Sequence, residues 1–158
     1  MVEPVPDLFR VTLLGTGAPP PLLGRFGPST LIEAGDQKFI FDAGRGAKQR
    51  LHQLGIPFAD ITGLLLLTHH HSDHVVGFVD LWLTGWIGRP WGNRQTPLRV
   101  WGPRGTNQMM EHLTFGVRSR SARAQQKLSH GRAKLESEEI EEGVVYSQKR
   151  HHHKRIQS

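Results

Sequence analysis

Residues 64–74, LLLLTHHHSDH, decide how this chain is interpreted. In the six residues that follow Thr68, three consecutive histidines precede a serine, an aspartate and a fourth histidine. The packing of a buried strand does not require so many ligand-type side chains at its end, whereas a metal site does. We therefore expect this loop to carry metal chemistry.

The spacing of the histidines matters more than their number. His69 and His71 are two residues apart, so in an extended segment their imidazoles point to the same side. In a helix the same spacing would place them on roughly opposite faces, where they could not share an ion. His70, between them, points the other way and is not expected to be a ligand. The His-x-His pair thus suits one zinc-like ion.

Asp73 and His74 follow at the point where the pattern becomes helical, since apolar residues recur near helical period over residues 75–83. Ser72 or Asp73 is the expected N-cap of this helix, which should run to about residues 85–86. The stretch therefore reads as strand, tight loop and helix, and the Asp-His pair is placed to bind a second ion.

The rest of the chain alternates strands and helices, which indicates an α/β sandwich. Gly35 and Asp36 are predicted to form the turn of a hairpin. A helix over residues 45–54 is expected to end at Gly55. The predicted strands cover residues 9–14, 29–34, 38–41, 61–67 and 98–103, and a last helix covers residues 106–113.

At 158 residues the chain is long enough for one compact domain with its own core. It contains no cysteine, so any bound metal must use histidine and carboxylate ligands. No apolar run approaches membrane-spanning length and residues 1–10 lack a secretory pattern. A soluble cytoplasmic protein without a membrane partner is therefore expected.

The net charge of +6 is unevenly spread, with +2 on residues 1–110 and +4 on residues 111–158. A basic excess favours an anionic partner such as RNA. A solubilising charged tail explains the same excess, because the excess lies where fold signals are weakest.

Four segments together resemble a known family. The motif His69-x-His71-x-Asp73-His74 after an apolar strand is similar to the signature of metallo-β-lactamase-fold hydrolases. The segments LLGTGAP (13–19), GPSTLIE (27–33) and FIFDAGRGA (39–47) resemble, in this order, the N-terminal half of ribonuclease Z-like proteins. The likeness runs from about residue 9 to about residue 114. It implies the two-sheet αββα sandwich of that family, here reduced to its N-terminal half.

The resemblance also implies two zinc ions and a metal-activated water that cleaves phosphodiesters. His69 and His71 would bind the first ion, and Asp73 and His74 the second. Asp73 is also expected to accept the proton of the water. By the same resemblance Asp42 supports the metal loop from behind, and an ordinary turn aspartate or helix cap is the alternative explanation of that residue.

In ribonuclease Z-like proteins the reaction is endonucleolytic cleavage at the 3′ side of precursor tRNA, which makes precursor tRNA the expected substrate. Other hydrolases of the fold act on a small anionic ester, sulfate, lactone or cyclic nucleotide, and the residues present are compatible with either. A further alternative is an inactive fragment or pseudoenzyme that keeps the metal loop. A basic nucleic-acid-binding module without chemistry rests on the tail charge alone.

The pattern changes after residue 116. Residues 1–116 read as the N-terminal half of a metallo-β-lactamase-like domain, and residues 117–158 as a degenerate or poorly ordered basic C-terminal segment. Within that segment residues 134–146 resemble the family again, as an acidic turn before a short strand. No segment after residue 114 matches the family's downstream histidine and aspartate ligands.

A half-domain leads to two expectations. The metal ions would lack protein ligands and would bind more weakly than in a complete site. The sheet would lack the layer that covers its inner face, and the exposed apolar surface would favour association, for example as a homodimer. The abrupt loss of pattern indicates a truncated or frame-shifted product, with residues 118–130 and 149–158 out of frame.

Overall fold

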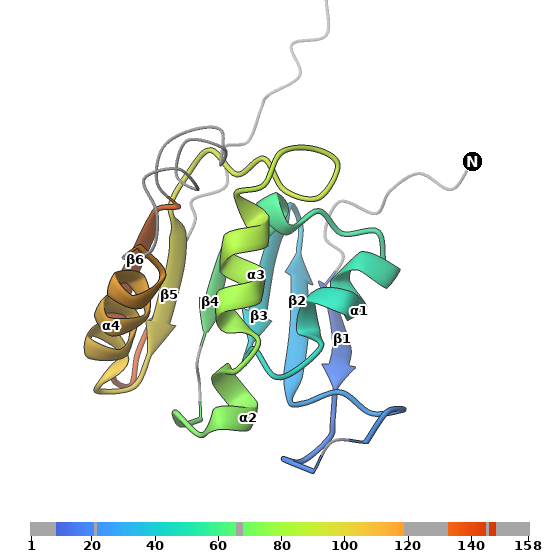
Figure 1. Cartoon of the computed structure of the whole chain (residues 1–158), viewed down its shortest axis with the longest axis horizontal. Coiled ribbons are helices and arrows are strands. Elements are labelled where there is room, and N and C mark those ends of the chain that lie inside the picture. Colours follow the sequence, from blue (N-terminus) through green and yellow to red (C-terminus); the bar gives the residue numbers. More distant parts are fainter. Residues whose placement is uncertain (1–8, 21, 66–67, 119–132, 145, 148–158) are drawn as a thin grey trace, which may run out of the picture.

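A computed structural model describes residues 9–20, 22–65, 68–118, 133–144 and 146–147. Its centre is one six-stranded sheet whose strands lie in the order of the sequence (Figure 1). The strands are β1 (Phe9–Gly15), β2 (Ser29–Ala34), β3 (Gln37–Phe41), β4 (Gly63–Leu65), β5 (Leu98–Gly102) and β6 (Leu135–Glu139).

The sheet changes direction at its third strand. β1, β2 and β3 pair antiparallel, and the β2–β3 hairpin turns at Gly35, whose φ of 60° favours glycine. From β3 onward all pairs are parallel. The carboxyl ends of β3, β4, β5 and β6 therefore meet at one edge of the sheet, where open α/β sheets place their sites.

The helices are α1 (Ala47–Gln53), α2 (Ser72–Val75), α3 (Phe78–Gly85) and α4 (Thr106–Arg118), with a short 3₁₀ turn η1 (Phe58–Asp60). In Figure 1 α1, α3 and α4 lie on the same side of the sheet. A row of apolar side chains crosses the sheet beneath them, and each is at most 1% exposed. This row comprises Leu31, Ile40, Leu64 and Val100. The predicted mixed α/β architecture is confirmed.

No described helix covers the opposite face of the sheet. On β1 the side chains of Phe9, Val11 and Leu13 are 65%, 53% and 66% exposed, and they alternate along the strand as residues of one face do. Nearer the centre, Trp101 packs against Phe39 on this face. The chain thus presents one sheet of the predicted sandwich with its inner face largely open.

The helix predicted to begin after Ser72 or Asp73 and to run to about residues 85–86 is interrupted, because α2 ends at Val75 and α3 begins at Phe78. Gly77 lies between them and its N–H donates to the Ala43 carbonyl at 2.8 Å. A Cβ on Gly77 would lie 2.4 Å from the carbonyl oxygen of Gly44. The break is therefore imposed by the close approach of the segment that follows β3, which local periodicity does not encode.

Several boundaries differ from the prediction. Helix α1 begins at residue 47 instead of 45, and β4 begins at residue 63 instead of 61. The N-cap of α2 is His71, whereas Ser72 or Asp73 was expected, and no side chain caps this helix. Helix α4 continues to Arg118. Within residues 134–146, where the sequence predicted an acidic turn before a short strand, the acidic segment 135–139 itself forms β6, which pairs in parallel with β5. The predicted strand end at residues 66–67 and most of the segments interpreted as out of frame, residues 119–130 and 149–158, lie outside the described residues.

A buried arginine joins η1 to the loop that precedes β5. Arg94 is 5% exposed, and its guanidinium donates to the carbonyls of Phe58 and Ile61 at 3.0 and 2.6 Å. Desolvation by burial lowers the pKa of Arg94 to about 10, partly opposed by the charge of Asp60. The side chain therefore stays charged near neutral pH, and the two carbonyls supply the hydrogen bonds that stabilise its buried charge. Among the described helices none is long and apolar enough to cross a membrane.

Candidate metal centre

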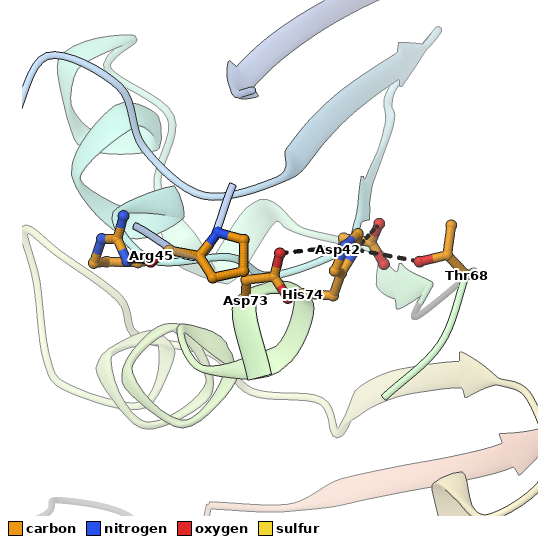
Figure 2. Close-up of polar contacts among 6 residues, drawn as sticks. Asp42, Arg45, Thr68, Asp73 and His74 are labelled. Carbon is orange, nitrogen blue, oxygen red and sulfur yellow. Dashed lines mark hydrogen bonds and ion pairs between the residues drawn. The ribbon is translucent and has the colours of Figure 1, made fainter. Parts of the chain in front are cut away.

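The residues expected to bind metal gather at the carboxyl edge of the parallel strands. Asp42 follows β3 directly, and the segment 68–71 follows β4. Asp73 and His74 lie in α2, immediately after that segment. Figure 2 shows Asp42, Asp73 and His74 side by side, although Asp42 is 32 positions away from His74 in sequence. The parallel pairing of β3 and β4 brings them together.

Three imidazoles form the centre of this cluster. The ring of His69 lies 4.1 Å from that of His71 and 4.4 Å from that of His74, between ring centroids. His70 points away from them and its Nε2 lies 2.9 Å from the hydroxyl of Thr106. The alternation that the spacing predicts for an extended segment is thus observed for residues 69–71.

His74 is held on one side by a carboxylate. Its Nδ1 lies 2.8 Å from Oδ2 of Asp42 and 3.2 Å from the hydroxyl of Thr68. An aspartate beside Nδ1 favours the tautomer with the proton on that nitrogen, which leaves the lone pair of Nε2 free as a ligand. Nε2 in turn lies 3.7 Å from Oδ2 of Asp73. The imidazole is therefore oriented between two carboxylates.

Asp42 itself is in an unusual position. It is 9% exposed and its φ is 60°, a conformation that aspartate tolerates better than most residues. Its second oxygen, Oδ1, is buried and has no hydrogen-bond partner among the described residues. A buried carboxylate oxygen without a partner is costly and indicates a site that another group completes.

The backbone locks the two halves of the cluster together. The N–H of Ala43 donates to the carbonyl of His74 at 2.7 Å. A Cβ on Gly44 would lie 2.7 Å from the carbonyl oxygen of Asp73, so the chain after Asp42 needs glycine at this position. This contact explains why small residues follow the aspartate in the sequence.

The donor types fit a zinc-class ion, since the cluster contains imidazole and carboxylate only. Their arrangement does not complete a site, because among the described residues no three histidine, cysteine, aspartate or glutamate side chains are placed to hold one ion. Two tetrahedral ions have eight coordination positions in total, some of which water or a ligand shared by both ions can fill. The four donors of the cluster fall short of the remainder. The chemical types of the donors therefore fit a zinc-class ion, whereas their number is too small for two complete sites.

Sequence reasoning did not assign a role to Thr68, Thr106 or Arg45. The guanidinium of Arg45 lies 3.4 and 3.3 Å from the carbonyls of Pro19 and Pro20, and Figure 2 shows this arginine on the side of Asp73 away from Thr68. A lone cation between Gly44 and Gly46 was the only sequence signal for it. Arg45 ties the proline-rich loop to the rim of the cluster.

The fold and the cluster define the class of protein. The chain superimposes on a diphosphatase from the PhnP family with a TM-score of 0.62 at 15% identity, covering 87% of this chain and 52% of the other. At that identity the likeness concerns the fold. The metallo-β-lactamase fold protein YhfI of Bacillus subtilis gives a TM-score of 0.59 at 18% identity, over 84% of this chain and 47% of that protein, so the fold is the metallo-β-lactamase fold. With the short form of human tRNase Z the TM-score is 0.58 at 26% identity, over 68% of this chain and 40% of the human one.

The family follows from the sequence comparison. Residues 9–126 match the family model described as Anti-Pycsar protein Apyc1, and the chain belongs to this family. A ribonuclease Z of Mycolicibacterium gilvum is 38% identical over 143 residues, which cover 88% of this chain and 49% of the relative. A ribonuclease Z of Mycobacterium marinum is 42% identical over 106 residues, covering 67% and 37%. The predicted resemblance to ribonuclease Z is confirmed, and the chain spans at most about half the length of these relatives.

Proposed function

We propose that the chain supplies half of the active site of a zinc-dependent phosphodiesterase of the ribonuclease Z type. The observation that carries this proposal is the pairing of Asp42 with His74, beside the imidazoles of His69 and His71. An aspartate that only stabilises a turn would not be expected to orient a histidine. Here Asp42 contacts Nδ1 of His74, and the other ring nitrogen of His74 faces the carboxylate of Asp73.

Each side chain has a distinct task in this proposal. His69 and His71 would hold one ion, and Asp73 and His74 the other, while Asp42 keeps the proton on Nδ1 of His74. When bound, the metal supplies a water of lowered pKa and charge stabilisation for the phosphoryl oxygens. The carboxylate of Asp73 is the group that would accept the proton of that water. The side chain of Asp73 is largely buried, with 12% of its surface exposed.

Precursor tRNA is the substrate class that we favour. The enzyme would act on it in the cytoplasm. The relatives named Ribonuclease Z support it, as does the basic excess of the chain. Arg45 adds a cation at the rim of the cluster that a phosphate group could approach. Parallel assays on precursor tRNA and on bis-aryl phosphate and sulfate esters distinguish this substrate from the small esters that other enzymes of the fold hydrolyse.

An inactive fragment is the competing explanation, because the chain corresponds to 49% or less of its relatives. We would measure zinc per purified chain for the wild type and for His69→Ala. A bound ion that is lost on the substitution, together with hydrolysis, supports the proposal. Less than one tightly bound ion per chain and no hydrolysis of any substrate favour the fragment.

We also propose that a second copy of this chain covers the apolar part of the open sheet face. Phe9, Val11 and Leu13 form a continuous apolar stripe on an edge strand, and such a stripe suits a two-fold interface in which both copies use the same patch. Light scattering should give a dimeric mass that Val11→Lys reduces to that of a monomer. Leu23→Lys is the control, because Leu23 is fully exposed in the loop between β1 and β2. An equal effect of both substitutions, or a monomeric wild type, would refute the interface.

A further inference from the structure

His70 lies in the donor segment without belonging to the donor cluster. Its Nε2 is 2.9 Å from the hydroxyl oxygen of Thr106, the first residue of α4. Thr106 is fully buried, and its own hydroxyl donates to the carbonyl of Pro103 at 2.6 Å. Because that proton is committed, the oxygen of Thr106 acts as acceptor and Nε2 of His70 as donor.

The beginning of α4 is in turn fixed by the last strand. Oε1 of Glu139, at the end of β6, accepts hydrogen bonds from the N–H groups of Gly105 and Asn107 at 2.9 and 3.2 Å. A carboxylate at this position satisfies N–H groups that have no partner inside the helix. The ring of His70 also lies against Gly105, since a Cβ there would be 3.6 Å from its Cε1.

We propose that His70 is a positioning residue, and that His70, Thr106 and Glu139 form a strut that sets the orientation of His69 and His71. The inference rests on the proposed metal site and adds residues that do not touch the metal. In an extended segment neighbouring side chains point to opposite sides, so fixing the middle one fixes the rotation of the segment about its axis. Both flanking imidazoles are then presented to the same side.

One side-chain hydrogen bond connects the donor segment to α4. Among the described residues, the hydrogen bond of His70 is the one side-chain hydrogen bond that ties residues 69–71 to another part of the sheet edge. The ring of His69 contacts the rings of His71 and His74, and these contacts stay within the donor cluster. Through the strut, β6 and α4 would set the orientation of residues 69–71, although both elements are remote from that loop in sequence.

Cobalt is a suitable probe, because its visible absorption reports the geometry of a zinc-type site. We would titrate the 158-residue chain with Co²⁺ and compare Thr106→Val, which keeps the shape and removes the hydroxyl, with Thr106→Ser, which keeps the hydroxyl. We expect Thr106→Val to weaken Co²⁺ binding about 10-fold and to change the absorption bands, as for other residues behind metal ligands. Thr106→Ser should resemble the wild type.

Two further measurements separate positioning from a general loss of structure. Glu139→Ala, at an exposed residue, should weaken Co²⁺ binding about 3-fold, with an unchanged far-ultraviolet spectrum. In the metal-free chain, nitrogen-15 spectra of the histidine rings should show His70 protonated on Nε2 in the wild type and in Thr106→Ser, and as a tautomer mixture in Thr106→Val.

The outcomes distinguish the strut from the metal site itself. Equal Co²⁺ affinity and absorption for Thr106→Val and Thr106→Ser would overturn the strut and leave the metal site standing. A wild-type chain that binds no Co²⁺ would overturn both. If Thr106→Val unfolds the chain, Glu139→Ala decides, and a Co²⁺ affinity equal to that of the wild type would overturn the strut.

Discussion

Asn in place of Asp42 isolates the contribution of one negative charge to the metal centre. The carboxylate lies 2.8 Å from Nδ1 of His74, and asparagine keeps a carbonyl oxygen that can accept the same hydrogen bond. Asparagine also tolerates the φ of 60° at this position, so the backbone should not move. The substitution therefore removes the charge and leaves the geometry.

The size of the effect follows from the hydrogen bond. A carboxylate behind a metal-bound histidine is worth about 10- to 100-fold in metal affinity, or about 1.4 to 2.8 kcal/mol. In the metal-free chain a charged hydrogen bond is replaced by a neutral one, which should cost about 1 kcal/mol of unfolding free energy. Asp42→Ala should cost about 2 to 4 kcal/mol, because Nδ1 of His74 loses its partner and alanine is strained at positive φ.

Competition titration with zinc would give the affinities, and urea denaturation of the metal-free chain the stabilities. Asp36→Asn is the matched control, since Asp36 is an exposed aspartate in the β2–β3 turn, at the opposite end of β3 from Asp42. We expect zinc affinity to fall in the order wild type, Asp42→Asn, Asp42→Ala, with Asp36→Asn equal to wild type. If Asp42→Asn binds zinc within 2-fold of the wild type, the carboxylate does not tune His74.

Three further predictions concern stability, each measured by urea denaturation. Gly77→Ala should destabilise the chain by about 1 to 3 kcal/mol, because its Cβ would meet the backbone oxygen of Gly44 at 2.4 Å; an unchanged midpoint would contradict the close approach. Gly116→Ala should stabilise by about 0.5 to 1 kcal/mol, since this helical position in α4 has open space around it and alanine is the better helix former. Arg94→Ala should cost at least about 2 kcal/mol because two carbonyls lose their donor, and Arg94→Lys, which keeps a charged donor, should cost less; equal losses would mean that packing alone matters.

Much of the fold was predictable from sequence because its signals are local. The strands β1, β2, β3 and β5 agree with the predicted ranges within one residue, and the hairpin turn falls at Gly35 as expected. These elements depend on alternation and turn chemistry, which neighbouring residues encode. The alternation of His69, His70 and His71 is predictable for the same reason.

Contacts between distant segments could not be predicted in this way. The break at Gly77 depends on the chain that follows β3. The strand expected within residues 134–146 falls on the charged segment 135–139, which the sequence predicted to be a turn. The bond from His70 to Thr106 spans 36 positions and exists only because β4 and β5 are parallel neighbours.

The sequence by itself determined which donors the loop offers and to which side of the chain each of them points. The tertiary structure alone decided what stands behind those donors, because parallel pairing brings Asp42 to His74 and α4 to His70 at one edge of the sheet. It also decided that α1, α3 and α4 lie on one face of the sheet, which leaves the stripe of Phe9, Val11 and Leu13 on the other face open. Periodicity specifies the orientation of a side chain within its element, whereas its partners depend on how the elements pair.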